Sequence, residues 1–144
     1  MITIEKIELP VAGIEQLRAE ARSEGYDFLD TLVEDWESAE NRFDAFGEIL
    51  CGHFDRGQLV AVGGLNCDPF AGQPDMGRIR RVYVRHDCRN QGIGRELVSF
   101  LVNYARSTFR SVRLRAENAH AARLYESMGF VAIESPDASH ILRL

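Results

Sequence analysis

Hydrophobic and polar positions along this chain follow two periods, and the period changes at glycine, proline and asparagine residues. Apolar residues at every second position predict a strand, whereas apolar residues three and four positions apart predict an amphipathic helix. We therefore expect strands over residues 2–7, 48–54, 58–65, 78–84, 111–116, 130–133 and 140–144. We expect helices over residues 14–23, 28–36, 94–108 and 118–128.

These elements give the order β-α-α-β-β-β-α-β-α-β-β, which is typical of an α/β protein. The chain has 144 residues, the size of one domain, and it shows no repeat, linker or low-complexity tract. We expect a single domain over residues 1–144 with a core large enough to be stable without disulfides.

Composition narrows the classes of function. The net charge of −5 disfavours binding to nucleic acid or to an acidic membrane. It suits a cationic acceptor such as an amine, although solubility explains it equally well. Three cysteines without paired spacing predict neither a disulfide framework nor a metal site. With no signal peptide and no apolar run of about 18 residues, we expect a cytoplasmic protein.

A glycine turn carries the strongest chemical signal. The residues Arg89-Asn90-Gln91-Gly92-Ile93-Gly94 lie between the alternating run 79–84 and the helix predicted from residue 94. Glycine lets a ligand approach the backbone, and the free N–H groups of a helix N-terminus attract anions. Arg89 and Arg95 flank the turn with positive charge. The pattern predicts a phosphate or pyrophosphate site.

Two familiar phosphate-binding motifs fit this turn poorly. A Walker P-loop requires Lys and Ser/Thr after its last glycine, but Arg95 and Glu96 follow Gly94. A dinucleotide-binding fingerprint requires a third small residue where this chain has Leu97. A plain structural turn and an Arg-x-x-Gly-x-Gly loop for the pyrophosphate of coenzyme A remain.

A second motif follows the turn at residues 118–130, with Asn118 and then an Ala-x-x-x-Tyr-x-x-x-Gly-Phe run from Ala121 to Phe130. Together, the two motifs make the segment 77–133 resemble the GNAT superfamily, the acyl-CoA-dependent N-acetyltransferases. The resemblance implies a GNAT-like fold, a central mixed β-sheet flanked by about four helices. It also implies acetyl-CoA as co-substrate without a metal ion. Because members of the family often dimerise through late strands, a homodimer is also an expectation.

The resemblance further implies which residues bind coenzyme A. The strand backbone would pair with the pantetheine arm and the acetyl oxygen, after splaying from the next parallel strand, at Val82, Tyr83 and Val84. The turn and its flanks would hold the pyrophosphate through Arg89, Asn90, Gln91, Gly92, Ile93, Gly94 and Arg95. The following helix would contribute Asn118 and Arg123. Alternatively, the arginines are solvated surface residues and Asn118 is only a helix N-cap.

Catalytic roles follow from the same resemblance. Tyr125 matches the tyrosine that donates a proton to the departing sulfur, although a packed core aromatic with a surface hydroxyl is the alternative. The position of the glutamate that serves many members as a base holds Arg78. His140 is a candidate base because histidine titrates near neutral pH, but a lone histidine is more often structural. Weaker candidates are His53, His86 and His120.

The polar segment after the second helix is the predicted acceptor site. It lies in the region that shapes the acceptor pocket of the superfamily, and its candidate residues are Asp35, Asn41, Arg42, Asp44 and Glu48. A solvated loop anchored by Phe43 and Phe46 is the alternative. Residues 66–70 form a second candidate wall.

The function that these residues favour is direct transfer of an acetyl group from acetyl-CoA to a primary amine in a ternary complex. No cysteine is placed to form a covalent intermediate. The alternatives are a GNAT-fold module that senses CoA without turnover and an unrelated nucleotide-binding domain. The sequence leaves the acceptor open among polyamines, aminoglycosides, amino acids, peptide N-termini and protein lysines.

Overall fold

The computed structural model describes residues 2–144, and within them the predicted order of strands and helices is confirmed. The strands are β1 (Ile2–Lys6), β2 (Ile49–Asp55), β3 (Gln58–Cys67), β4 (Met76–Val84), β5 (Ser111–Leu114), β6 (Val131–Ala132) and β7 (His140–Arg143). The helices are α1 (Ile14–Ser23), α2 (Phe28–Glu37), α3 (Ile93–Ala105) and α4 (Ala119–Ser127), and a 3-10 turn covers His86–Cys88.

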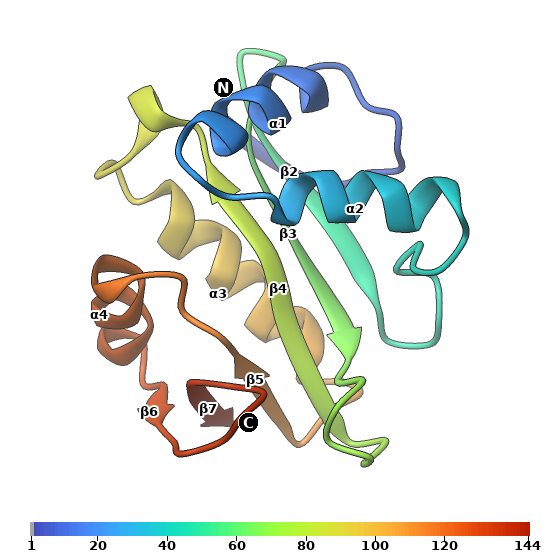
Figure 1. The fold of residues 1–144 in the computed structure, drawn as a ribbon. Coiled ribbons are helices and arrows are strands. Elements are labelled where there is room, and N and C mark those ends of the chain that lie inside the picture. The colour runs from blue at the N-terminus through green and yellow to red at the C-terminus, as the bar shows by residue number, and fades with distance from the viewer. Residues whose placement is uncertain (1) are drawn as a thin grey trace.

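All the strands form one mixed sheet in the order β1-β2-β3-β4-β5-β7-β6. The β4–β5 pair is parallel, because α3 crosses over between these strands, and the other neighbouring pairs are antiparallel. Figure 1 shows β4 running through the middle of the molecule, with α3 and α4 beside it. The predicted central mixed β-sheet flanked by about four helices is confirmed.

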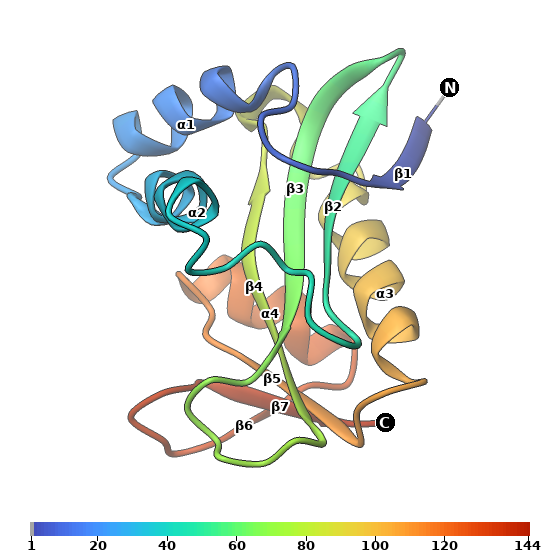
Figure 2. The ribbon, with the colours of Figure 1, turned by 90° about the vertical axis from the view of Figure 1, so that its right-hand side faces the viewer.

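Helices cover both faces of the sheet and divide the core in two (Figure 2). On one face α1 and α2 bury Leu17, Leu29 and Leu32 against β2 and β3. On the other face α3 buries Leu97 and Leu101, and α4 adds Tyr125 to the same cluster. Each helix turns one apolar stripe to the sheet, as their three- and four-residue spacing predicts.

The sheet opens between β4 and β5. The two strands pair only from Met76 to Arg78 on β4 and from Ser111 to Arg113 on β5. Strand β5 ends at Leu114, earlier than the predicted residue 116, because the Ala116 amide donates to the Ser139 hydroxyl at 2.8 Å instead. Among the described residues, the side of β4 that faces β5 therefore has no strand partner beyond Arg78.

A β-bulge interrupts β4 in this open stretch. Arg80 pairs with Gly64 and Tyr83 with Val62, so Arg81 and Val82 together oppose one residue of β3. Arg81 has a φ of 61°, in the left-handed region that a residue with a Cβ rarely adopts. Such bulges re-aim side chains, and strained residues cluster at functional sites. The sequence pattern did not predict this bulge.

The remaining differences lie at element ends. Helix α3 ends at Ala105 rather than at residue 108, because the amides of Thr108 and Phe109 both turn back to the Ala105 carbonyl. The last hairpin is shorter than predicted, since β6 holds two residues. Among the described helices, none has the length and hydropathy needed to cross a membrane.

Candidate functional site

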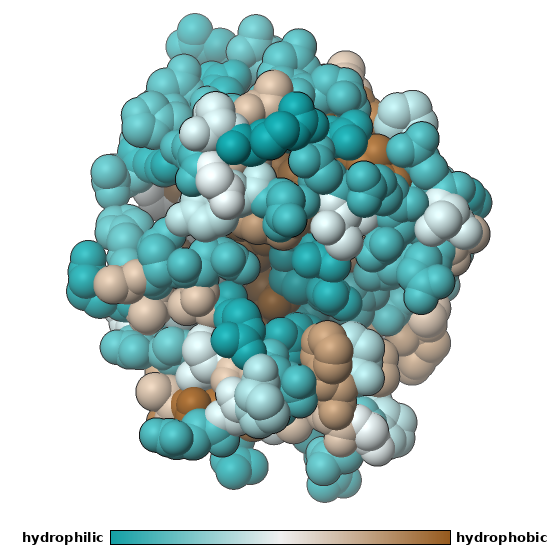
Figure 3. Space-filling model, viewed as in Figure 1, coloured by the Kyte–Doolittle hydropathy of each residue, from teal (hydrophilic) through white to brown (hydrophobic). Residues whose placement is uncertain are grey.

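A large cleft opens where β4, the glycine turn and α4 meet. Its volume of about 670 Å³ lies within the range of small-molecule sites. Figure 3 shows a hollow near the middle of this face, with hydrophobic colour in its depth and hydrophilic side chains around it. The lining residues are Tyr26, Phe28, Val82, Tyr83, Val84, Arg89, Asn90, Gly92, Ile93, Gly94, Arg95, Glu117, Asn118, His120, Ala121, Arg123, Leu124 and Tyr125.

The glycine turn presents its backbone to this cleft. Gly92 caps α3 with a φ of 84°, and Asn90 has a φ of 61°. A Cβ on Gly92 would meet no protein atom within 4 Å, so the space beside it is open. Within residues 2–144, the amides of residues 90–95 find no acceptor, while the next amide, from Glu96, bonds to the Gly92 carbonyl. Free amides at a helix N-terminus can bind a phosphate.

Arg89 reaches across the cleft wall to α1. Its guanidinium donates to both carboxylate oxygens of Glu24, at 3.0 and 2.7 Å, and to the Val84 carbonyl at 2.9 Å. It also lies over the Tyr83 ring, 5.2 Å from the ring centroid, within the distance of about 6 Å at which a cation is attracted to an aromatic face. The hydrogen bond from Arg89 lowers the pKa of Glu24 to about 2. The predicted free charge at the turn is therefore largely neutralised by Glu24, which the sequence did not indicate.

The other predicted cofactor residues divide between the two sides of the cleft. Arg95 lines the cleft from α3 and donates to the Ser127 hydroxyl at 2.6 Å, which joins α3 to α4. Arg123 is exposed and lines the cleft from α4. The structure brings the predicted cofactor residues together with one exception, Gln91, whose side chain is exposed and turns back to the Asp87 carbonyl.

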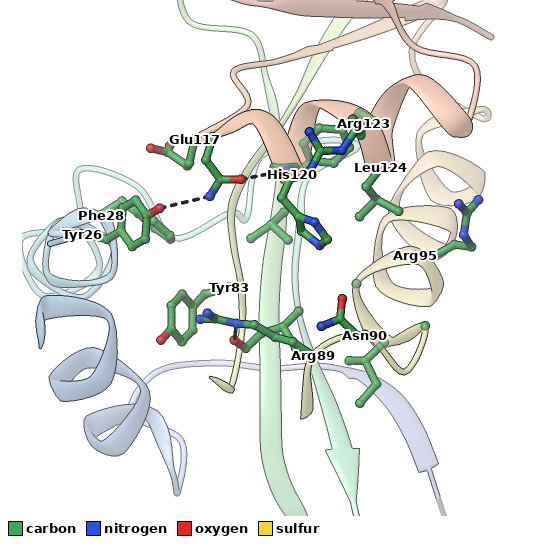
Figure 4. Close-up of a pocket in the computed structure, with 18 residues that line it drawn as sticks. Tyr26, Phe28, Tyr83, Arg89, Asn90, Arg95, Glu117, His120, Arg123 and Leu124 are labelled. Carbon is green, nitrogen blue, oxygen red and sulfur yellow. Dashed lines mark hydrogen bonds between the residues drawn. The ribbon is translucent and has the colours of Figure 1, made fainter. Parts of the chain in front are cut away.

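Asn118 spans the mouth of the cleft. Its side-chain oxygen accepts from the Ala121 amide at 2.8 Å, so it is the predicted N-cap of α4. Its amide group donates to the Tyr26 hydroxyl at 3.1 Å, as the dashed line in Figure 4 marks. Tyr26 precedes α2 and packs against Phe28 in a tilted arrangement, with ring centroids 5.7 Å apart. Thus α4 is fastened to the α1–α2 connection across the cleft.

Tyr125 lies on α4 with its ring buried and packed against Phe130, the centroids 5.7 Å apart. Its hydroxyl makes no hydrogen bond to the described residues, and the residue lines the large cleft. Burial, with a smaller contribution from the charge of Glu117, raises the pKa of Tyr125 to about 12. The phenol is therefore protonated at neutral pH and able to donate.

A second, smaller cavity joins the large cleft at Phe28, Val82, Glu117 and Tyr125. We call it the arginine cavity, because four of its lining residues are arginines of β4 and of the segment after β5. Its volume is about 150 Å³. Its lining consists of Phe28, Arg78, Ile79, Arg80, Arg81, Val82, Leu114, Arg115, Glu117 and Tyr125.

The histidines take other places. His140 is buried, and its ring nitrogens lie 2.8 Å from Glu126 and 2.8 Å from Ser139, while it lines neither cavity. His140, the predicted base, therefore pairs with Glu126 and does not lie at the cleft. His53 is buried beside Glu96, and His86 lies near Glu24. Only His120, exposed on α4, reaches the large cleft.

The predicted acceptor residues also lie outside both cavities. Asn41 exchanges two amide hydrogen bonds with Asn66, at 2.9 and 3.0 Å, and Arg42 donates to the Trp36 carbonyl. Glu48 accepts from the amides of Ala45 and Cys67, so its carboxylate holds the connection to β3. Asp44 is exposed. These contacts hold Asn41, Arg42 and Glu48 in the loop structure, and the fold brings none of the three to either cavity.

Asp35 differs from the other four, since its carboxylate approaches Arg81 of the arginine cavity at 4.0 Å. Of the residues that line both cavities, Phe28 and Glu117 were not singled out from the sequence, nor was Arg80, which lines the arginine cavity alone. Glu117 stands directly before the N-cap Asn118, and Arg80 lies in the strand leading to the glycine turn. Their positions beside recognised motifs were the available signal.

Comparisons with known proteins agree with this geometry. The model of the Acetyltransferase (GNAT) family matches residues 12–130. A structure from Exiguobacterium sp. 255-15, assigned as an acetyltransferase, is 26% identical and superposes with a TM-score of 0.89, covering 99% of this chain and 93% of that one.

More distant structures share the fold. The Salmonella typhimurium protein yncA, also assigned as an acetyltransferase and solved with its cofactor acetyl-CoA, is 19% identical, with a TM-score of 0.74 over 99% of this chain and 94% of that one. A GCN5-related N-acetyltransferase from Kribbella flavida is 18% identical, with a TM-score of 0.76 over 99% and 98%. Since the family model spans most of the sequence and both motifs line one cleft, the chain belongs to the GNAT acetyltransferase family.

Proposed function

We propose that the protein transfers the acetyl group of acetyl-CoA directly to a primary amine, with both substrates bound together. The observation that carries this proposal is the junction of two cavities at Tyr125. The large cleft can take the long cofactor, the arginine cavity can take an acceptor, and the two meet at a phenol that is able to donate a proton. Holding both reactants at one point removes the need for a covalent relay.

The cleft fits coenzyme A in its donor groups. The free amides of residues 90–95 and the open space at Gly92 suit a pyrophosphate. The unpaired side of β4 offers N–H and C=O groups to an extended arm, as an added strand would use them. When bound, acetyl-CoA would supply an acyl group activated as a thioester.

Two side chains would then handle protons. In the overall transfer the amine nitrogen bonds to the acetyl carbon, the carbon–sulfur bond breaks, and the sulfur leaves with a proton. Tyr125 would donate that proton, since burial keeps its hydroxyl protonated. Glu117 lines both cavities beside Tyr125, and its carboxylate would accept the proton that the amine must lose. This role for Glu117 replaces the one first expected of His140.

The cysteines do not favour an acyl-enzyme route. Burial raises the pKa of Cys51 to about 12, and burial also raises the pKa of Cys88. A thiol with a raised pKa is rarely the thiolate that nucleophilic attack requires. Neither residue lines the large cleft or the arginine cavity.

The test is CoA release from acetyl-CoA with a panel of primary amines, for the wild type and for Tyr125→Phe. We expect kcat to fall about 100-fold in the variant with the KM for acetyl-CoA nearly unchanged, because general acid catalysis contributes on that order. Tyr104→Phe is the matched control, since Tyr104 is 40% exposed on α3 and lines neither cavity.

Two results would contradict the proposal. An unchanged kcat in Tyr125→Phe would remove the tyrosine from the mechanism. Acetyl-CoA binding without CoA release for any amine would favour a CoA-sensing module, the alternative that Arg78 suggests by standing in place of the strand glutamate.

A further inference from the structure

The arginine cavity concentrates positive charge in a chain whose net charge is −5. Arg78, Arg80, Arg81 and Arg115 line it, and Glu117 is the one carboxylate among the residues that line it. Arginines gathered in this way need anionic partners, because removing a guanidinium from water costs free energy unless the group is paired.

Protein groups pair with three of these arginines. Arg78 contacts buried Asp68 at 3.3 Å and donates to the Asp137 carbonyl at 2.6 Å. Arg81 approaches Asp35 at 4.0 Å, and Arg115 donates to the Pro136 carbonyl. The carboxylate of Asp68 is also shared with Arg113 at 2.9 Å, so the neighbouring acids do not balance the arginines.

Arg80 is the exception. It is half-buried, and within residues 2–144 it makes neither a hydrogen bond nor an ion pair. Burial, followed by repulsion from Arg81 and Arg78, lowers the pKa of Arg80 to about 10, which still leaves it charged at neutral pH. It lies one residue before the bulge at Arg81, on the open part of β4. A guanidinium in this state is poised for an external anion, because its planar fork matches a carboxylate or a phosphate.

The size of the cavity limits what can enter. A volume of about 150 Å³ holds a few small groups, since one water occupies about 30 Å³ in the liquid. An anionic group and a short carbon chain fit within this volume. A polyamine would bring positive charge to the arginines and be repelled.

We infer that the acceptor is a small primary amine that carries a carboxylate or phosphate group, held by Arg80 in the arginine cavity with its amine beside Glu117 and Tyr125. This inference rests on the proposed acetyl transfer and names its substrate class. A zwitterion matches the site in both parts, because its anion would face the arginines and its ammonium would face the carboxylate of Glu117. The ammonium loses two protons in the reaction. One passes to Glu117 and leaves the amine that attacks, and the second, lost from the nitrogen after attack, replaces the proton that Tyr125 gives to the sulfur.

The experiment compares amines with and without an anionic group, with acetyl-CoA saturating. Glycine is paired with glycinamide, phosphoethanolamine with ethanolamine, and spermidine serves as the cationic acceptor. We expect kcat/KM to be at least about tenfold higher for an anionic member than for its neutral partner. The pair with the larger ratio identifies carboxylate or phosphate as the recognised group.

Variants then assign the preference to Arg80. Arg80→Gln should raise the KM for the anionic amine about tenfold and leave the KM for acetyl-CoA unchanged, while Arg80→Lys should retain part of the preference. Arg110→Gln is the control, because Arg110 is 88% exposed and lies outside both cavities. The wild-type comparison stands even if Arg80→Gln does not fold.

The outcomes separate this inference from the proposed function. Acetylation of neutral amines or spermidine as well as their anionic counterparts would overturn the inference and leave the acetyl transfer standing. An intact preference in folded Arg80→Gln would also overturn it. No CoA release with any amine, while acetyl-CoA still raises the melting temperature, would overturn the proposed transfer and the inference with it.

Discussion

The large cleft and the arginine cavity share a boundary at Tyr125, yet they are built in different ways. The cleft offers backbone groups, namely the amides of residues 90–95 and the unpaired side of β4. The cavity offers charged side chains, of which Arg80 is unpaired among the described residues. Backbone recognition tolerates sequence change, so a family can keep one cofactor while side chains vary the acceptor.

Charge is also treated differently in the two regions. At the cleft, Glu24 neutralises Arg89, and free amides are left for a ligand. In the cavity, the acids available near Arg78, Arg80 and Arg81 are too few to neutralise them. The difference suggests that shape and dipoles dominate at the first site and formal charge at the second. This contrast predicts distinct responses to mutation.

We expect the largest effect from a substitution that changes only the large cleft. Gly92→Trp should abolish acetyl-CoA binding, because its side chain would fill the open space beside the turn. At a thousandfold over its Kd, acetyl-CoA should stabilise the wild type by about 4.1 kcal/mol, and a melt of the variant should show no such shift. Gly57→Trp is the matched control, since Gly57 has a φ of 79° and equally open surroundings at a hairpin tip. Retained binding in Gly92→Trp would mean that the turn does not face the cofactor.

The next effect is on the scaffold of the arginine cavity. Asp68 is fully buried and holds Arg78 and Arg113, so Asp68→Asn should lower the free energy of unfolding by about 3 kcal/mol. Urea unfolding at pH 7 measures it. Asp75→Asn is the control, because Asp75 is 48% exposed and lies 3.8 Å from Arg110. If the free energy of unfolding falls no more in Asp68→Asn than in this control, the buried ion pairs of Asp68 do not contribute to stability.

The contribution of Asp68 to the free energy of unfolding should depend on pH. Burial would raise the pKa of Asp68, but hydrogen bonds from Arg113 and from the Phe70 amide bring it below its usual value. A carboxylate with a lowered folded pKa stabilises the fold above its unfolded pKa of about 3.9 and loses that contribution as the pH falls. The difference in the free energy of unfolding between the wild type and Asp68→Asn should therefore be smaller at pH 3 than at pH 7. A constant difference would exclude the ionised carboxylate as its cause.

The smallest effect concerns Arg89. If its charge is already satisfied by Glu24, Arg89→Gln should raise the Kd for acetyl-CoA only about fivefold, the equivalent of about one hydrogen bond. Calorimetric titration measures it, with Arg106→Gln as an exposed control outside the cleft. A much larger loss would mean that Arg89 leaves Glu24 to bind the pyrophosphate.

The fold followed from local patterns because they agree with the tertiary contacts. Helix α1 runs over the predicted residues 14–23, where Leu17 and Ala21 form one buried stripe. The glycine turn and the Asn118 cap were also readable, since both depend on residues close together in sequence. The end of β5 was not, because Ser139, far along the chain, captures the Ala116 amide.

The candidate acceptor residues show more clearly what the sequence could not predict. Asn41 and Glu48 looked like ligands in a polar segment, but Asn66 and the Cys67 amide pair with them. Arg78 was noticed only because it stands in place of a glutamate, and the cavity that it shares with Arg80 and Arg81 depends on the bulge and on Leu114 and Glu117 from beyond α3.

The sequence by itself determined the order of elements, the family motifs and the turn that opens α3, because each is encoded by neighbouring residues. Only the tertiary structure decided that Glu24 neutralises Arg89, that His140 pairs with Glu126, and that Arg80 finds no hydrogen-bond or ion-pair partner among residues 2–144. The physical reason is that a side chain's charge state and partners depend on groups brought close by folding. Such contacts leave no periodic trace in the sequence.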